Sequence, residues 1–437
     1  FLFLLQFLII LGMCRGLGQL FQRVKQPTIT ADLLVGILLG PTVLARLLPG
    51  VSGWLFPRDV TQRTMLETVA WIGILFLLLD TGLEVNFSNV WRQRRRAMKI
   101  SALDLCIPIL LTGLLIYFLP FRYGEQSRVL FTLFLATIMT LSAMPVAIRA
   151  MHDLGILKTE MGFLIISALS INDIIGWMVF TVILGVVTSA GLSVSSVGMV
   201  VAATVAFAVL SLVYVRKLSD RVITGLKKGQ PEPSGLTITF ISLVGMACGA
   251  ITQRIGIHSL FGFFIAGLAV GEARDLTEWD RNVFSKLVYA IFVPVFFANL
   301  GLKLDFAAHF DLVLVVFITV IGIGARYIAA WLGAAWAGRP RNNRAVIAVA
   351  HVPGGEMHLV IGLLALEYGL ISERVFVAVV SAAVFSSIIL GPWLSSALAR
   401  RKKVEISEYI PATGAVLPVE SQSSEGAIHH LCAAAAR

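Results

Sequence analysis

Long apolar segments, separated by short polar loops, follow one another along most of this 437-residue chain. A helix needs about 20 mostly apolar residues to cross the hydrocarbon core of a bilayer, which is about 30 Å thick. Charged residues make up only 14% of the chain, against about 25% in soluble domains. The sequence therefore predicts an all-α polytopic membrane protein with about 13 transmembrane helices. The predicted spans are residues 1–22, 28–48, 64–82, 97–119, 127–150, 158–188, 194–215, 235–253, 257–272, 283–301, 311–336, 343–367 and 374–399.

Lys and Arg are unevenly divided between the loops that join these spans. With the N-terminus outside and the loops alternating, the inside loops hold about three times as many basic residues as the outside loops, and such a bias marks the cytoplasmic side. We therefore expect a multi-pass protein of the cell (inner) membrane with a cytoplasmic C-terminus. This placement explains the net charge of +10 without a nucleic-acid partner. The inside loops include the basic stretches 91–99, 215–229, 338–344 and 400–403.

The two halves of the chain resemble each other. Three pairs of segments match in the same order: LLVGILLG (33–40) resembles FFIAGLAVG (263–271), LLLDTGLEVNF (77–87) resembles FFANLGLKLDF (296–306), and SALSINDII (167–175) resembles SAAVFSSII (381–389). The matches align the second to sixth spans with the ninth to thirteenth. Five spans per repeat and a shift of seven spans place the two repeats in opposite orientations, an inverted-topology repeat of the kind found in secondary transporters. Composition bias among apolar helices is the alternative explanation.

Corresponding spans in the two halves each contain a proline. Residues 136–155 read ATIMTLSAMPVAIRAMHDLG, and residues 348–369 read AVAHVPGGEMHLVIGLLALEYG. Pro145 and Pro353 each remove a backbone donor and clash with the preceding helical turn. Two discontinuous helices at corresponding positions predict a binding site near the middle of the membrane. Two ordinary proline kinks are the alternative.

A carboxylate lies inside one of the apolar spans. Asp173 stands about halfway along 158–188, next to Asn172. A charged side chain at the centre of a bilayer costs at least about 2.5–3.5 kcal/mol, so such residues usually line a cavity and mark function. Burial disfavours the ionised form of a carboxylate, and the side chain would then hold either a proton or a cation. A satisfied structural hydrogen bond is the alternative for Asp173, and a helix-packing amide for Asn172.

Other charged residues within the spans are candidates for supporting roles. Asp80 either reaches the midplane site or lies at the membrane interface. Arg326 is always charged and needs a partner inside the membrane, for which Glu356, directly after Pro353-Gly354-Gly355, is the predicted residue. Asp104 has no motif around it and is interpreted as structural.

Polar side chains flank both predicted breaks. Thr140 and Ser142 offer oxygen ligands of the type that hard cations prefer, although capping of the broken helix explains them equally well. His351 and His358 flank the second break, where a pH sensor and polar packing near a cavity are the two interpretations. We expect no cofactor, and no metal other than a transported monovalent cation.

Seven motifs are spread over residues 1–400: QPTITADLLVGILLGPTVL, LLLDTGLEVNF, TLSAMP, SINDIIGW, PVFFANLGLKLDF, GARY and PGGEMHL. Together they resemble the monovalent cation:proton antiporter superfamily, in its bacterial sodium or potassium/proton branch. The resemblance implies a sodium/proton antiporter-like fold and a homodimer in which a helical core moves like an elevator against a dimerisation scaffold. The implied core lies at about 97–188 and 311–399, the scaffold at about 1–82 and 194–301, and a disordered cytoplasmic tail at 401–437.

The resemblance also assigns roles to residues. In that family the second residue of the paired motif binds the cation or proton, which here is Asp173. Members with Asn-Asp are generally electroneutral, and some pair the Asn with an acidic residue on another span, for which Asp80 is the candidate. The chain departs from the family at 143–145, which read Ala-Met-Pro where many relatives have Thr-Asp-Pro, and at Leu169, where a serine is expected. These departures leave the choice between Na⁺ and K⁺ open.

The predicted function is antiport of a monovalent cation, Na⁺ first and K⁺ or Li⁺ next, against H⁺, with Asp173 binding cation and proton in competition. One alternative is a gradient-driven transporter of an organic anion on a related fold, anchored by Arg326, although the Asp173 carboxylate would repel such a substrate. Another alternative is a non-transporting membrane ion sensor. The sequence contains no GxSxG, HExxH or Walker A motif, so an ion gradient is the expected energy source.

Overall fold

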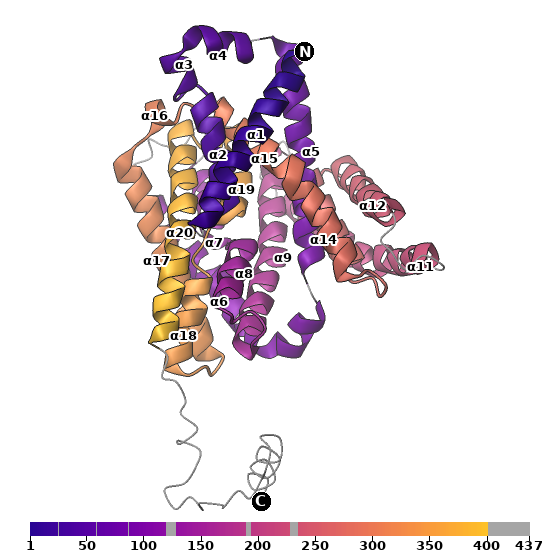
Figure 1. Ribbon diagram of the computed structural model, residues 1–437. Helices are drawn as coiled ribbons and strands as arrows, with labels where there is room; N and C mark the ends of the chain where they lie inside the picture. The colour runs from indigo at the N-terminus through magenta and orange to yellow at the C-terminus, as the bar shows by residue number, and fades with distance from the viewer. Residues whose placement is uncertain are drawn as a thin grey trace, which may run out of the picture. The chain divides into compact units, whose positions relative to one another are not determined.

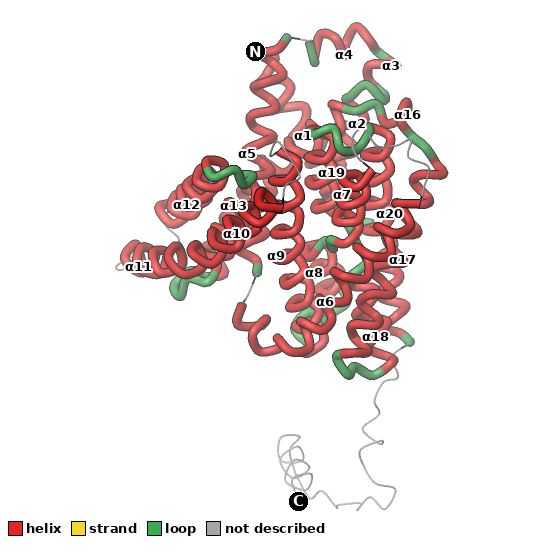
Figure 2. Tube along the Cα trace, turned by 180° about the vertical axis from the view of Figure 1, so that it is seen from behind, coloured by secondary structure: helices red, strands yellow, loops and turns green. Residues whose placement is uncertain are grey.

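The computed structural model describes residues 1–24, 26–57, 59–85, 87–118, 128–188, 194–227 and 235–400. These residues form helices, loops and turns, with no strand among them (Figure 1, Figure 2). The predicted all-α membrane fold is confirmed. The chain divides into two units, Phe1–Leu398 and Ala399–Arg437, and the fold given below is that of the first. The predicted disordered tail, 401–437, lies outside the described residues.

The described residues form twenty α-helices and two π-helical turns. The first half comprises α1 (Leu2–Arg23), α2 (Thr28–Leu39), α3 (Leu44–Leu47), α4 (Pro49–Leu55), α5 (Val60–Glu84), α6 (Phe87–Phe118), α7 (Arg128–Thr140), α8 (Met144–Asp153) and α9 (Glu160–Thr188). The second half comprises α10 (Val194–Leu210), η1 (Ser211–Val215), α11 (Arg216–Lys227), α12 (Gly235–Arg254), α13 (Ser259–Gly271), α14 (Glu278–Leu287), η2 (Val288–Phe292), α15 (Val293–Lys303), α16 (Phe306–His309), α17 (Leu312–Trp336), α18 (Arg341–Ala350), α19 (Gly355–Glu367) and α20 (Glu373–Ala399).

The number of membrane spans is smaller than the predicted 13. Within the described residues, eleven helical segments are long and apolar enough to cross a membrane, or twelve if the bent pair α18 and α19 counts as one span. The predicted span 257–272 accounts for the remaining difference, because its helix, α13, has only 13 residues. At 1.5 Å per residue such a helix is about 20 Å long, shorter than the hydrocarbon core of about 30 Å.

Two helix crossings are related by the predicted repeat. In the first, α2 packs on α15, and a Cβ added at Gly36 would lie only 2.1 Å from the carbonyl oxygen of Ala298. In the second, α13 packs on α5, and a Cβ at Gly267 would lie 2.1 Å from the carbonyl oxygen of Leu79. The repeat exchanges α2 with α13 and α15 with α5, so the same backbone contact occurs once in each half.

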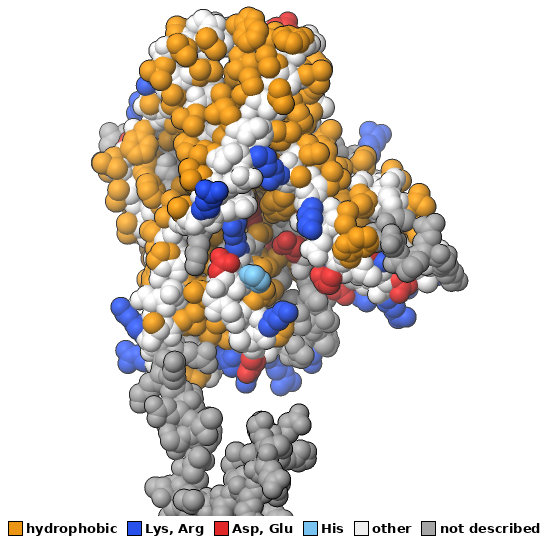
Figure 3. Space-filling view, in the orientation of Figure 1, with side chains coloured by type: hydrophobic (Ala, Val, Ile, Leu, Met, Phe, Trp, Pro, Cys, Tyr) orange, Lys and Arg blue, Asp and Glu red, His pale blue; other side chains and the backbone are white. Residues whose placement is uncertain are grey.

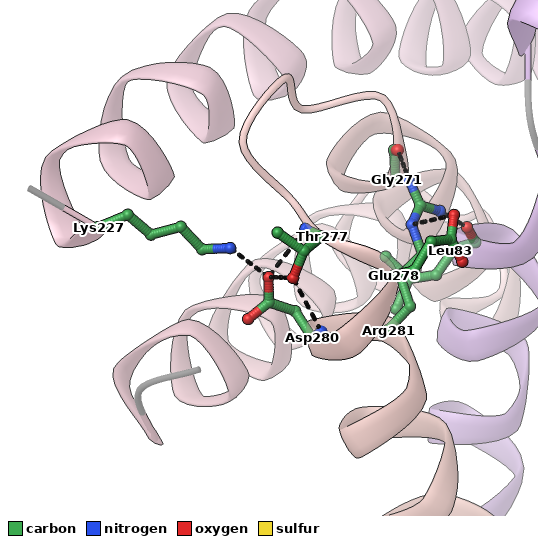
Figure 4. A network of polar contacts seen from close by, with 7 residues as sticks. All are labelled: Leu83, Lys227, Gly271, Thr277, Glu278, Asp280 and Arg281. Carbon is green, nitrogen blue, oxygen red and sulfur yellow. Dashed lines mark hydrogen bonds and ion pairs between the residues drawn. The ribbon is translucent and has the colours of Figure 1, made fainter. Parts of the chain in front are cut away.

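Side chains hold the ends of these helices in place. The guanidinium of Arg281, on α14, donates hydrogen bonds to the carbonyl oxygens of Leu83 and Gly271, at the ends of α5 and α13 (Figure 4). These carbonyls have no partner within their own helices. Asp280 completes a capping box with Thr277 and also accepts a hydrogen bond from Lys227 on α11. The α14 helix is thereby tied to α5, α11 and α13.

The remaining packing places α6 at the centre of one group of helices, since it contacts α7, α9 and α17. In both views α3 and α4 lie near the N-terminus, α18 lies at the opposite end, and α11 lies beside α12 (Figure 1, Figure 2). Hydrophobic side chains cover most of the upper part of the face in Figure 3, whereas charged side chains gather lower down. An apolar surface of this extent suits contact with lipid.

Candidate functional site

Both predicted helix breaks are present. The first separates α7, which ends at Thr140, from α8, which begins at Met144. The second separates α18 from α19, whose axes differ by 45°. Pro145 is the second residue of α8, a position in the first turn where a proline N–H is not missed. The two breaks lie in segments that correspond under the repeat.

The two breaks cross each other in direct contact. The backbone N–H of Ala143 donates to the carbonyl oxygen of Pro353 at 2.7 Å, and the hydroxyl of Ser142 donates to the carbonyl oxygen of His351 at 2.6 Å. Gly355 has φ +47°, and a Cβ there would lie 2.2 Å from the Cβ of Ala143. The crossing therefore requires glycine at this position, both for its backbone conformation and for space.

Arg326, buried on α17, holds the first break. Its Nη1 donates to the carbonyl oxygen of Leu141 at 3.0 Å, and its Nε donates to that of Gly322 at 3.0 Å. The predicted ion pair between Arg326 and Glu356 is wrong, because neither oxygen of Glu356 has a hydrogen-bond partner within the described part of the chain. Arg326 binds elsewhere because the first helix break leaves the buried carbonyl of Leu141 in need of a donor, and the guanidinium supplies that donor.

Asn172 is buried on α9 and bonds to α6 through both ends of its amide. Its Nδ2 donates to Oδ2 of Asp104, and its Oδ1 accepts from the hydroxyl of Ser101. The expectation that Asp80 would pair with this Asn is therefore wrong, and Asp104, interpreted from the sequence as structural, takes that place. The missed signal is the spacing of Ser101 and Asp104, which puts two polar side chains on one face of an apolar helix.

Asp80 lies at the edge of the site. Its buried carboxylate accepts a hydrogen bond of 3.0 Å from the hydroxyl of Ser285 on α14. Glu84, the last residue of α5, lies one turn further along the same helix, and its side chain is exposed. The hydrogen bond of Asp80 is therefore made to α14 and not to Asn172.

Asp173 and Glu356 are the central pair. Their side chains are 1% and 0% exposed, and their carboxylates interact electrostatically. None of their four oxygens has a hydrogen-bond partner among the described residues. A buried carboxylate without a partner is strongly unfavourable when ionised. The arrangement therefore calls for a proton or a cation at this pair.

The other candidate ligands are close to the breaks but already donate elsewhere. The hydroxyl of Thr140 donates to the carbonyl oxygen of Ala136 at 2.8 Å, within α7. Since a hydroxyl that donates keeps its lone pairs, Thr140 and Ser142 retain the capacity to accept or to bind a cation. His351 lies 2.8 Å from the carbonyl oxygen of Ile347 and 3.9 Å from Oδ2 of Asp104. Its Nε2 has no hydrogen-bond partner among the described residues, and His358 is buried on α19.

Two broken helices that cross beside a pair of buried carboxylates, in a bundle with an inverted repeat, define a secondary transporter. Residues 7–400 match the family described as "Sodium/hydrogen exchanger, transmembrane". The chain belongs to this family of monovalent cation/proton antiporters, and it is a transporter rather than an enzyme.

Individual relatives carry either cation in their names. The chain is 25% identical to the Na(+)/H(+) antiporter NhaS4 of Synechocystis over 400 residues, 90% of this chain and 96% of the relative. It is 26% identical to K(+)/H(+) antiporter 1 of Saccharomyces cerevisiae over 407 residues, 90% of this chain and 46% of the relative. The chain spans half or less of the yeast protein and of several Arabidopsis thaliana cation/H(+) antiporters.

The fold is also found in a solved structure. The sodium proton antiporter MjNhaP1 from Methanocaldococcus jannaschii, at pH 8, superposes with a TM-score of 0.66 at 17% sequence identity. The match covers 90% of this chain and 96% of that chain. The predicted sodium/proton antiporter-like fold is confirmed.

Proposed function

We propose that the protein exchanges Na⁺, K⁺ or Li⁺ for H⁺, with Asp173 binding cation and proton in competition. The observation that carries this proposal is the pair of buried carboxylates without hydrogen-bond partners, beside the crossing of the two breaks. When both carboxylates are ionised, the buried site needs a bound cation. When a proton is bound, the site no longer needs the cation, so cation and proton replace each other. Relatives named as Na(+)/H(+) and K(+)/H(+) antiporters support both cations.

One cation is proposed to exchange for one proton. Asn172 is neutral and its amide is engaged by Asp104 and Ser101, so it adds no second titrating group beside Asp173. The Asn-Asp form of the motif supports the same stoichiometry through the family resemblance. Under this proposal the transport cycle moves no net charge, and an imposed membrane potential leaves the exchange rate unchanged.

The proposed transport movement is an elevator in a homodimer. The contacts of α6 with α7, α9 and α17 support one moving core, which carries both breaks and Asp173. The contacts of α5 with α13 and α15, and of α2 with α1 and α15, support a separate scaffold for dimerisation. The proposed setting is the cell (inner) membrane, with the N-terminus outside and the C-terminus in the cytoplasm.

Reconstitution in proteoliposomes tests the proposal. Addition of Na⁺, K⁺ or Li⁺ should dissipate an imposed pH gradient, with and without a clamped membrane potential. Asp173→Asn should abolish the response to all three cations, whereas Glu278→Gln, at a side chain that is 87% exposed, should leave it intact. Exchange that persists in Asp173→Asn rejects the proposal.

Further measurements distinguish the proposed antiporter from an anion transporter and from a non-transporting sensor. An anion transporter would need Arg326 free to hold its substrate, but this guanidinium is already engaged by Leu141 and Gly322. Counterflow of labelled organic acids tests that function directly. A non-transporting sensor would bind the cation, seen as stabilisation against heat, without dissipating the pH gradient.

A further inference from the structure

We propose that Glu356 is a second carboxylate of the exchange site and binds the transported cation jointly with Asp173. This inference rests on the proposed function, because it concerns the same site. It replaces the structural role expected of Glu356, since the partner expected for it, Arg326, is engaged elsewhere.

No hydrogen bond or ion pair to another described residue accounts for the burial of Glu356. The side chain is completely buried, and both carboxylate oxygens lack a hydrogen-bond partner there. A carboxylate kept for packing or for capping would be expected to accept hydrogen bonds. Glu356 is the second residue of α19, where the positive end of the helix dipole favours a negative charge. The position stabilises the ionised form while leaving its oxygens free for a ligand.

The neighbouring charges favour a cation between the two carboxylates. The carboxylate of Glu356 acts electrostatically on that of Asp173, and both carboxylates are buried without a hydrogen-bond partner among the described residues. Both carboxylates cannot be ionised side by side in a buried site without a positive charge. A monovalent cation between them supplies that charge and can use up to four carboxylate oxygens from two chain segments.

Two cavities that share lining residues lie beside Glu356 and the end of α8. Glu356 lines a small cavity of about 20 Å³, together with Pro27, Val146 and Ser387. The same three residues also line a larger cavity of about 310 Å³, which extends to Arg149 and Asp153 at the end of α8. The small cavity has room for about one water molecule. Glu356 is the buried carboxylate among the residues that line these two cavities.

Charge balance is compatible with the proposed stoichiometry. Two ionised carboxylates with one monovalent cation carry a net charge of −1, and the same pair with one shared proton also carries −1. The proton leaves the pair when the cation enters, and no other group changes its charge. Joint binding by Asp173 and Glu356 therefore keeps the exchange at one cation for one proton.

The test compares Glu356→Gln with wild-type protein in proteoliposomes and in detergent. Glu356→Gln should raise the KM for the cation at least tenfold while the rate at saturating cation stays within about threefold. In Glu356→Gln, stabilisation of the protein against heat should require a concentration of Na⁺ or K⁺ at least tenfold higher than in wild type. Loss of a purely structural side chain would not change this concentration. Glu367→Gln, on the same helix but exposed, is the matched control and should behave as wild type.

If Glu356→Gln does not fold, the variant Glu356→Asp tests whether Glu356 binds the cation. The shorter carboxylate keeps the charge but moves the oxygens, so the proposal expects an altered order of apparent affinity among Li⁺, Na⁺ and K⁺. A wild-type KM and cation stabilisation in Glu356→Gln, or an unchanged order in Glu356→Asp, overturns the inference. Either result together with an inactive Asp173→Asn leaves the proposed function standing, whereas an active Asp173→Asn rejects the proposed function itself.

Discussion

Asn172 on α9 donates a hydrogen bond from its amide to the carboxylate of Asp104 on α6. The amide oxygen of Asn172 accepts a hydrogen bond from the hydroxyl of Ser101, which lies on α6 about one turn before Asp104. The two residues of the Asn-Asp motif therefore face in different directions, as the rotation of about 100° per residue in a helix requires. Asn172 holds α9 against α6, whereas the carboxylate of Asp173 has no hydrogen-bond partner among the described residues.

The first prediction exchanges the partners of this hydrogen bond. Asn172→Asp should destabilise the protein, because two carboxylates would then face each other in a buried position. The double variant Asn172→Asp with Asp104→Asn restores one amide and one carboxylate. Thermal unfolding in detergent should show a coupling energy of about 0.5–3 kcal/mol between the two sites. Strictly additive effects of the two substitutions would contradict a direct hydrogen bond.

A second prediction concerns the arginine at the first helix break. Arg326→Ala removes the donor to the carbonyl oxygen of Leu141 at the helix break, and a buried carbonyl without a partner costs about 1–3 kcal/mol. We expect a lower thermal stability and a strong loss of exchange. Arg96→Ala, which removes a surface ion pair with Glu160, should change stability by no more than about 1 kcal/mol. Equal effects of the two variants would show that Arg326 does not hold the break.

The third prediction tests the glycine at the crossing. Gly355→Ala places a Cβ in a strained backbone conformation and only 2.2 Å from the Cβ of Ala143, so the two breaks have to separate. We expect reduced exchange and a lower unfolding temperature. Gly324→Ala, on α17 with no atom within 4 Å of the added Cβ, is the control and should be neutral or slightly stabilising. Normal exchange by Gly355→Ala would rule out a tight crossing.

The fourth prediction is a pH dependence outside the membrane-spanning segments. The pKa of Asp305, between α15 and α16, is lowered from its usual value: burial, the largest single effect, raises it, but the hydrogen bond from the Ala308 N–H and the interactions with Arg46 together outweigh it. Because the folded-state pKa lies below the unfolded value of about 3.9, this group stabilises the protein above that pH. The stabilisation is lost as the pH falls through the folded-state pKa.

Measurement of unfolding temperature between about pH 3 and pH 6 checks this point. The difference in unfolding temperature between wild type and Asp305→Asn should be largest at about pH 6 and should shrink towards about pH 3. Its size should stay within about 1 kcal/mol, because Arg46 and Asp305 are partly exposed. A difference that grows as the pH falls would contradict the sign of the argument.

Several features of the fold follow from local sequence alone. The apolar segments predict the helices, because a stretch that must lie in lipid satisfies its backbone within itself. Pro145 and Pro353 predict the two breaks, because a proline removes a hydrogen bond of the helix; proline alone does not decide the outcome, since Pro108 and Pro392 lie inside the continuous helices α6 and α20. The predicted count of 13 spans is wrong by one or two because apolarity does not reveal that α13 is too short to cross unaided.

The sequence by itself determined that this chain is a membrane protein with an inverted repeat, two broken helices and a buried aspartate, since these depend on composition and on neighbouring residues. Only the tertiary structure decided which groups meet. Asn172 and Asp104 are 68 residues apart, and Arg326 and Leu141 are 185 apart. Their partners were wrongly predicted because the choice between several buried polar groups depends on how helices rotate and cross. The same packing left the carboxylates of Asp173 and Glu356 buried without a hydrogen-bond partner among the described residues, which no local pattern reveals.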